Sequence, residues 1–243
     1  MDQHTSAAPA TPAATARELP ESIEVSTGPE PEFSVIWLHG LGADGHDFEP
    51  VVPMLGLPAG AAVRFVFPHA PVRPVTLNGG MAMRAWYDIK AISASRDQDE
   101  AGIAHSAALL HALLDRERER GVPAARQLVA GFSQGGAMAL HVALRYPERL
   151  AGLVALSSYL LFPERLAAER SQANADLPVF VGHGTQDPVV PHAMGAATAQ
   201  QLQSLQQPVE FHSYPLPHSV SMEELADIGG FLARCGAGAV PGA

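Results

Sequence analysis

A serine near the middle of the chain has the flanking residues of a nucleophile. Residues 131–135 read Gly-Phe-Ser-Gln-Gly, between an apolar run and a stretch typical of a helix. A sharp turn from strand to helix would hold the hydroxyl of Ser133 above a sheet edge, and the two glycines would leave room for the surrounding backbone. The N–H of Gln134, at the start of the helix, could then donate to an oxyanion. The pattern favours nucleophilic catalysis by Ser133.

A serine nucleophile needs a base, and the base needs a third group that orients it. In folds that carry this serine turn, an acidic residue and then a histidine follow in the chain, each after a later strand. Asp187 lies in a turn-rich segment after the apolar run 178–181, and His218 follows the run 209–214. We therefore predict Ser133, Asp187 and His218 as the catalytic residues.

A second glycine-rich turn could supply another oxyanion donor. Residues 39–42 read His-Gly-Leu-Gly, directly after an apolar run. Glycine on both sides of Leu41 lets the backbone turn so that the Leu41 N–H points into a pocket. Together with the N–H of Gln134 it would hold a tetrahedral oxyanion, and losing one such donor commonly costs about 3 kcal/mol. We expect His39 to shape this turn through hydrogen bonds.

The elements that must position these residues are short apolar runs alternating with helical patterns. This alternation favours an α/β fold with a mostly parallel central sheet covered by helices. Strands are expected over 33–38, 62–67, 127–130, 150–156, 178–181 and 209–214, with a weaker candidate at 23–26. Helices are expected over 100–120, 134–146, 193–206 and 222–233. Because ligands bind at the carboxyl ends of such strands, the three predicted catalytic residues should meet there.

Residues 68–99 form a long connection that contains three prolines and a Gly79-Gly80 pair. A connection of this length in a compact domain is usually functional, so it could wall a substrate pocket. Met81 and Trp86 are the candidate pocket residues within it. Packing against a neighbouring helix explains both residues equally well.

Length, charge and cysteine content limit the class of protein. The 243 residues are enough for one domain, and no apolar run is long enough for a membrane helix. A net charge of −10 disfavours binding to nucleic acid or to anionic lipid. Cys235 is the only cysteine, which excludes an intrachain disulfide and a zinc site of several cysteines. We expect no cofactor and no metal, because the spacing of His183, Asp187 and His192 is not a known ligand pattern.

The start of the chain differs in composition from the rest. Residues 1–22 are rich in Ala, Pro and Thr and are expected to form a disordered tail before a single domain over 23–243. They lack a basic start followed by an apolar stretch, so the cytoplasm is the expected compartment. We expect a small-molecule or acylated substrate, no nucleic-acid partner and no membrane insertion, and we leave a homodimer open. Alternating charges at 115–120 predict a solvent-exposed helix end.

Six motifs occur in order along the chain: Leu38-His39-Gly40-Leu41-Gly42, Pro68-His69-Ala70-Pro71, Trp86-Tyr87-Asp88, Gly131-Phe132-Ser133-Gln134-Gly135-Gly136, Gly184-Thr185-Gln186-Asp187-Pro188-Val189-Val190-Pro191 and His218-Ser219-Val220. Over residues 33–234 they resemble the phospholipase/carboxylesterase family, which includes bacterial carboxylesterases and acyl-protein thioesterases. The resemblance implies an α/β-hydrolase fold without a large cap domain, with Ser133 as nucleophile, His218 as base and Asp187 as its orienter. Leu216-Pro217 stands where family members often carry Met-Gly, so Leu216 is a further candidate for the pocket wall.

These observations predict a serine hydrolase that cleaves carboxylic acyl esters through an acyl-enzyme. A carboxylester, a thioester on an acylated protein and a lysophospholipid are all open as substrates, because sequence does not reveal the volume of the pocket. A lactone or C–C bond hydrolase on the same fold is the nearer alternative. A non-catalytic binding protein is the alternative from another class, but such a protein typically lacks a catalytic residue.

Overall fold

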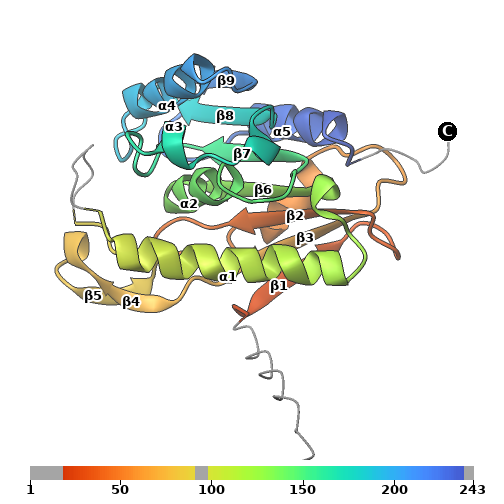
Figure 1. Ribbon diagram of the computed structural model, residues 1–243, viewed down its shortest axis with the longest axis horizontal. Coiled ribbons are helices and arrows are strands. Elements are labelled where there is room, and N and C mark those ends of the chain that lie inside the picture. The colour runs from red at the N-terminus through yellow and green to blue at the C-terminus, as the bar shows by residue number, and fades with distance from the viewer. Residues whose placement is uncertain (1–18, 91–97, 238–243) are drawn as a thin grey trace, which may run out of the picture.

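The computed structural model describes residues 19–90 and 98–237. A seven-stranded sheet in the order β1-β3-β2-β6-β7-β8-β9 runs through the molecule (Figure 1). All neighbouring strands in it are parallel except the pair β1 and β3. The strands are β1 (Ser22–Ser26), β2 (Phe33–Leu38), β3 (Val63–Pro68), β4 (Val72–Val75), β5 (Met81–Arg84), β6 (Gln127–Phe132), β7 (Gly152–Leu156), β8 (Val179–Gly184) and β9 (Val209–Tyr214). The predicted mostly parallel α/β sheet is confirmed.

Helices cover both faces of this sheet. The α-helices are α1 (Glu100–Glu119), α2 (Gln134–Ala143), α3 (Leu166–Glu169), α4 (His192–Ser204) and α5 (Met222–Arg234). The 3-10 helices are η1 (Glu49–Met54), η2 (Thr76–Asn78), η3 (Ala124–Arg126) and η4 (Gln172–Asn174). Helices α1, α2 and α4 contact the sheet on one side, while α5 packs with η1 on the other. None of the helices in the described part of the chain is long and apolar enough to cross a membrane.

Alternation along the strands divides the core into two layers. Ile36 and Leu38 of β2 belong to the cluster beneath α1 and α2, whereas Val35 and Trp37 belong to the cluster beneath α5. This division follows from the two-residue period of a strand, which sends successive side chains to opposite faces. Every residue of β2, β3, β7 and β8 is buried, which explains why these strands are continuous apolar runs.

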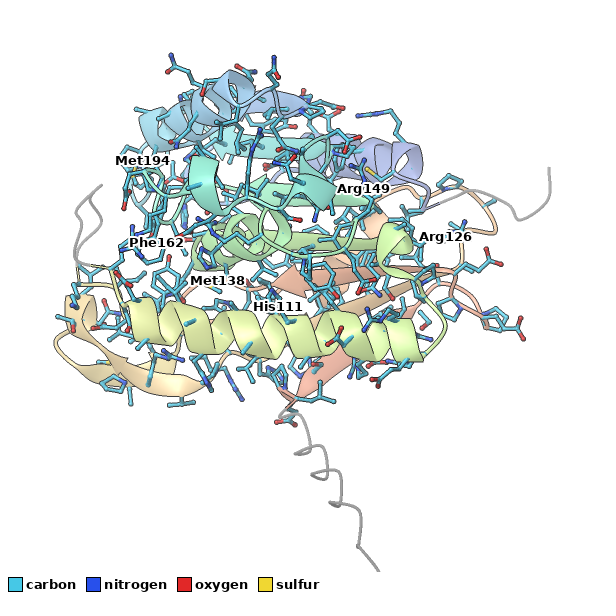
Figure 2. The ribbon with its side chains drawn as sticks, in the orientation of Figure 1. His111, Arg126, Met138, Arg149, Phe162 and Met194 are labelled. Carbon is cyan, nitrogen blue, oxygen red and sulfur yellow. The ribbon has the colours of Figure 1, made fainter. Side chains whose placement is uncertain are left out.

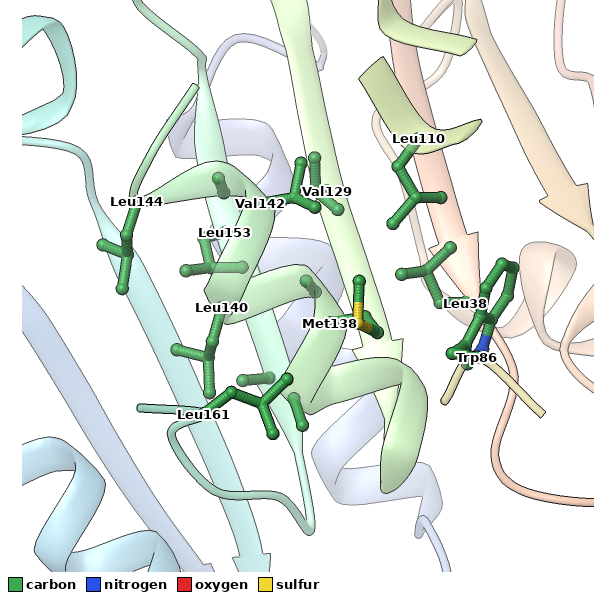
Figure 3. Packing of buried hydrophobic residues seen from close by; sticks show 14 of the residues in the cluster. Leu38, Trp86, Leu110, Val129, Met138, Leu140, Val142, Leu144, Leu153 and Leu161 are labelled. Carbon is green, nitrogen blue, oxygen red and sulfur yellow. The ribbon is translucent and has the colours of Figure 1, made fainter. Parts of the chain in front are cut away.

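The helix after Ser133 is locked into the core by its own side chains. Met138 of α2 lies among residues of β2, β6 and α1, close to Leu38, Leu110 and Val129 (Figure 3). On the outer part of the same layer, His111 of α1 meets the ring of Tyr146 edge-on, at 5.3 Å between centroids (Figure 2). These contacts pack the middle of α2 and the segment after its C-terminal end against the sheet and α1.

Three predicted features need correction. Helix α2 ends at Ala143 rather than at residue 146. After it, the Arg145 N–H donates to the Val142 carbonyl, three residues earlier, as in a 3-10 turn and not four residues earlier as in an α-helix. The connection 68–99 is not a loop throughout, since β4 and β5 pair as an antiparallel hairpin around η2. The hairpin lies beside the N-terminal end of α1 (Figure 1). Residues 91–97 of this connection, and residues 1–18 of the predicted tail, lie outside the described residues.

The third correction concerns the charged end of α1. Glu117 is fully buried rather than solvated. One of its carboxylate oxygens accepts hydrogen bonds from Ser34 Oγ at 2.6 Å and Arg64 Nη1 at 2.7 Å. The other accepts hydrogen bonds from Arg116 and Arg120. The alternating charges therefore include one internal ion-pair network that ties α1 to β2 and β3.

Candidate active site

Ser133 occupies a strained turn between β6 and α2. Its φ of 54° and ψ of −118° lie in a region that non-glycine residues seldom adopt. A Cβ on Gly131 would lie 2.3 Å from the Gly135 carbonyl oxygen, and one on Gly135 would lie 2.4 Å from the Leu38 carbonyl oxygen. The turn is held by a hydrogen bond from Ser133 N–H to the Leu156 carbonyl, 2.8 Å long. Both glycines of the sequence motif are therefore required by backbone contacts.

Asp187 and His218 lie together after neighbouring strands. Asp187 follows β8 and His218 follows β9, and His218 Nδ1 lies 2.6 Å from Asp187 Oδ2. The other carboxylate oxygen accepts hydrogen bonds from the N–H groups of Val189 and Val190 at 2.8 and 2.9 Å. Because an ionised carboxylate only accepts, this contact places the proton of the imidazole on Nδ1 and leaves Nε2 as an acceptor.

The electrostatics of Asp187 keep the carboxylate ionised. Burial by itself would raise its pKa, but the hydrogen bonds from His218 and from the Val190 and Val189 amides outweigh burial and lower the pKa. His183, near the end of β8, also faces this carboxylate, with Nε2 3.6 Å from Asp187 Oδ2 and 2.9 Å from the Val190 carbonyl oxygen. Burial lowers the pKa of His183, so the imidazole is neutral.

Ser133 and His218 line one cavity of about 390 Å³. The predicted oxyanion donors Leu41 and Gln134 line it as well. Gln134 is the first residue of α2, so its N–H has no acceptor within the helix. A substrate carbonyl oxygen bound in this cavity would therefore lie next to the turn that carries Leu41 and the turn that carries Gln134.

Hydrogen bonds of His39 shape the turn that carries Leu41. The Nε2 atom of His39 accepts from the Ala70 N–H at 3.0 Å, and Nδ1 donates to the Gly40 carbonyl oxygen at 2.7 Å. Burial lowers the pKa of His39 to about 4, which keeps the ring neutral. The Gly42 N–H donates to the Arg84 carbonyl at 2.9 Å, and Gly42 has a φ of 77°, which glycine adopts without strain.

None of the three residues expected to wall the pocket lines this cavity. Trp86 is fully buried, and its Nε1–H donates to the His39 carbonyl oxygen at 3.0 Å. Leu216 is buried against Gly184, and Met81 is 64% exposed at the start of β5. The long connection contributes to the cavity wall through Leu77, Asn78 and Ile89 instead. Local sequence could not show which residues of this connection line the cavity. In the folded hairpin, Met81 points away from the cavity, and the residues of the preceding 3-10 helix η2 border it.

The structural role of the Gln134 side chain, and that of Tyr159, were not predicted from the sequence. The side chain of Gln134 accepts from the Trp86 N–H at 2.9 Å and donates to the Tyr87 carbonyl at 2.7 Å. Tyr159 borders the cavity, and its hydroxyl lies 3.0 Å from that of Tyr87. The only sequence signal for Gln134 was its place after the serine. Within residues 19–90 and 98–237, no group of three or more His, Cys, Asp or Glu side chains is arranged to hold a metal ion.

Comparison with known proteins identifies the class to which this fold and cavity belong. The model of the phospholipase/carboxylesterase family matches residues 21–236. The chain belongs to this family, and it is a serine hydrolase of esters or thioesters. It is similar to acyl-protein thioesterase 1 of Neurospora crassa, with 42% identity over 208 residues, 82% of this chain and 85% of the relative. Acyl-protein thioesterase 1 of Mycosarcoma maydis is 38% identical over 227 residues, 87% of this chain and 95% of the relative.

Solved structures agree with this assignment. Arabidopsis thaliana SOBER1 superposes with a TM-score of 0.78 at 31% identity, covering 84% of this chain and 98% of that one. Zea mays acyl-protein thioesterase 2 superposes with a TM-score of 0.78 at 30% identity, covering 89% of this chain and 99% of that one. The predicted α/β-hydrolase fold is confirmed.

Proposed function

We propose that Ser133, His218 and Asp187 carry out acyl transfer to water. Ser133 Oγ attacks the carbonyl carbon while His218 Nε2 takes its proton, and the backbone N–H groups of Leu41 and Gln134 hold the oxyanion. The C–O or C–S bond then breaks, and His218 protonates the departing alcohol or thiol. A water molecule, deprotonated by His218, releases the carboxylic acid from the acyl-enzyme. Asp187 stays ionised and orients the imidazole throughout.

One observation carries this assignment. The hydrogen bond of 2.6 Å between Asp187 and His218 fixes the imidazole of a histidine that lines the same cavity as Ser133. A base with a fixed tautomer beside a serine in a strained turn is the arrangement that serine hydrolysis requires. It favours catalysis over a role as a non-catalytic binding protein.

The substrate class follows from the cavity and the relatives. Leu41, Leu77, Ile89 and Val189 give the cavity an apolar wall that suits an acyl chain. Because the curated relatives are named acyl-protein thioesterases, we propose S-acylated proteins as substrates beside simple carboxylesters. Lysophospholipids, and lactone or C–C bond hydrolysis, are alternatives that a substrate panel separates.

Labelling with a fluorophosphonate tests the role of Ser133. The wild type should be labelled and should hydrolyse p-nitrophenyl butyrate, while Ser133→Ala should do neither. Ser204→Ala, an exposed serine at the end of α4, serves as the matched control and should behave as wild type. Equal labelling of Ser133→Ala and wild type would remove Ser133 from the mechanism. A series of p-nitrophenyl esters of rising chain length, beside an S-palmitoylated peptide, then ranks the substrate classes by kcat/KM.

We also propose, on sequence grounds, a cytoplasmic protein with a single domain behind an Ala/Pro/Thr-rich tail. The tail is shorter than the expected residues 1–22, because β1 begins at Ser22 and the Glu21 carbonyl accepts a hydrogen bond from the His69 N–H. Cys235, the only cysteine, cannot form an intrachain disulfide, which suits a reducing compartment. Sedimentation velocity would separate monomer from homodimer, and limited proteolysis would test the tail.

A further inference from the structure

Among the described residues that line the cavity beside Ser133, Asp47 is the one acidic residue, and none is a lysine or an arginine. Asp47 lies in the loop between β2 and η1 and is exposed to solvent, so it is ionised at neutral pH. Within the described residues, its side chain has no hydrogen bond and no ion pair. An unpaired negative charge therefore faces any molecule that enters the cavity.

The electrostatic surroundings of Asp47 agree with this geometry. Burial of part of the side chain raises its pKa, and the neighbouring Asp44 carboxylate raises it further. No positively charged group of the described chain offsets these two effects. A bound cation would supply the charge that the protein itself does not.

A row of aromatic rings connects the loop that carries Asp47 to His218. Phe48, the next residue, packs on Phe132 with 5.7 Å between ring centroids, and Phe132 packs on His218 with 4.6 Å. Asp47 and His218 both line the cavity, and these contacts join Phe48, the neighbour of Asp47, to His218, the group that protonates the leaving alcohol or thiol. The apolar residues Leu77 and Ile89 come from the hairpin segment instead, where an acyl chain would pack.

We propose that Asp47 is a specificity-determining residue that favours substrates whose alcohol or thiol leaving group carries a positive charge. This inference rests on the proposed roles of Ser133 and His218. Attraction between a cation and a carboxylate over a few ångströms in a partly exposed site should favour the charged substrate by roughly three- to tenfold in kcat/KM. A quaternary ammonium group and a lysine beside an acylated cysteine offer the same chemistry.

Two thioesters of one acyl chain test the proposal. Butyrylthiocholine carries a trimethylammonium group, and S-(3,3-dimethylbutyl) thiobutanoate is its neutral isostere. The readout is the ratio of kcat/KM for the two, measured by thiol release. Because thiocholine is intrinsically the better leaving group, the comparison is between variants: we expect the wild-type ratio to be roughly three- to tenfold higher than that of Asp47→Asn, to shrink in 0.5 M NaCl, and to fall further in Asp47→Lys. Asp176→Asn, an exposed carboxylate before β8 that pairs with Arg149, should keep the wild-type ratio.

A second arm uses short S-butyryl-cysteine peptides with lysine or glutamine beside the cysteine. A lysine preference that is lost in Asp47→Asn assigns the cation to a peptide, while a preference confined to the choline thioester assigns it to a small thiol or alcohol. Either result supports the proposal. Equal ratios in wild type and Asp47→Asn in both arms would overturn it and leave the proposed function intact. If the wild type cleaves no ester or thioester, the proposed function fails and this inference fails with it.

Discussion

At the scale of single residues, the site depends on which nitrogen of His218 carries the proton. Asp187 Oδ1 is occupied by the Val189 and Val190 amides, so only Oδ2 is free to hold the imidazole. A carboxylate at this position accepts from Nδ1–H and leaves Nε2 free to act as a base. The backbone donors hold the carboxylate in that orientation before any substrate arrives.

Asp187→Asn should therefore lower kcat by roughly three to four orders of magnitude while the protein stays folded. The amide oxygen can keep the bonds from Val189 and Val190, so the amide nitrogen would face His218 and favour the tautomer with the proton on Nε2. Steady-state kinetics beside circular dichroism would measure both effects. An unchanged kcat in a folded variant would point to another carboxylate.

At the scale of secondary-structure elements, helix α1 is held against the sheet by a buried ion pair as well as by apolar packing. Glu117 on the last turn of α1 accepts from Ser34 of β2 and from Arg64 of β3. Removing one partner of a buried ion pair leaves the other without compensation, which is strongly destabilising. The network therefore fixes the position of α1 against β2 and β3.

Glu117→Ala should lower the free energy of unfolding by about 3 kcal/mol, because it leaves Arg64 and Ser34 without their acceptor. Urea unfolding followed by circular dichroism would measure the change. Glu119→Ala, on the exposed end of the same helix, is the matched control and should cost well under 1 kcal/mol. A similar loss in both variants would mean that the effect comes from helix charge and not from the buried network.

Many of the helices and strands were predictable from the amino-acid sequence. The segments 33–38 and 209–214 match β2 and β9 at both ends. β2 is buried along its whole length, as expected from a hydrophobic run bounded by turn residues, whereas β9 is mostly half-buried or exposed. The hairpin β4–β5 was not predicted, since β4 contains Pro74 and only one buried residue. Its position depends on contacts with distant segments, such as the bond from Gly42 N–H to the Arg84 carbonyl.

At the scale of the whole molecule, buried titratable groups make stability depend on pH in two opposite ways. Glu224 of α5 is buried behind Gly182, and its carboxylate oxygens have no partner within the described residues. Burial raises its pKa from 4.5 to about 8, so the folded protein holds this proton longer than the unfolded chain. The contribution of Glu224 to stability is present below pH 4.5 and is lost as the pH rises through 8. His39, with a pKa lowered from 6.5 to about 4 by burial, destabilises the fold as the pH falls through that range.

Glu224→Gln should flatten the alkaline side of the stability profile. The wild type should lose on the order of 3 kcal/mol of unfolding free energy between pH 6 and pH 9 that the variant retains, since glutamine has no proton to release. Urea unfolding at both pH values would measure the difference. Glu223→Gln, the exposed neighbour on α5, is the control and should follow the wild type. Identical pH dependence in all three proteins would show that Glu224 is not buried in this way.

The sequence by itself determined the local geometry and the order of the chemistry. Gly131 and Gly135 around Ser133 permit a tight turn wherever the strand lies, and the strand patterns before Asp187 and His218 place both residues after strands. These properties are local, because they follow from backbone sterics and from the two-residue period of a strand. Only the tertiary structure decided which side chains face the cavity. Trp86 and Leu216 face the core, Glu117 is internal, and Asp47 borders the cavity, because burial depends on neighbours brought together from distant parts of the chain.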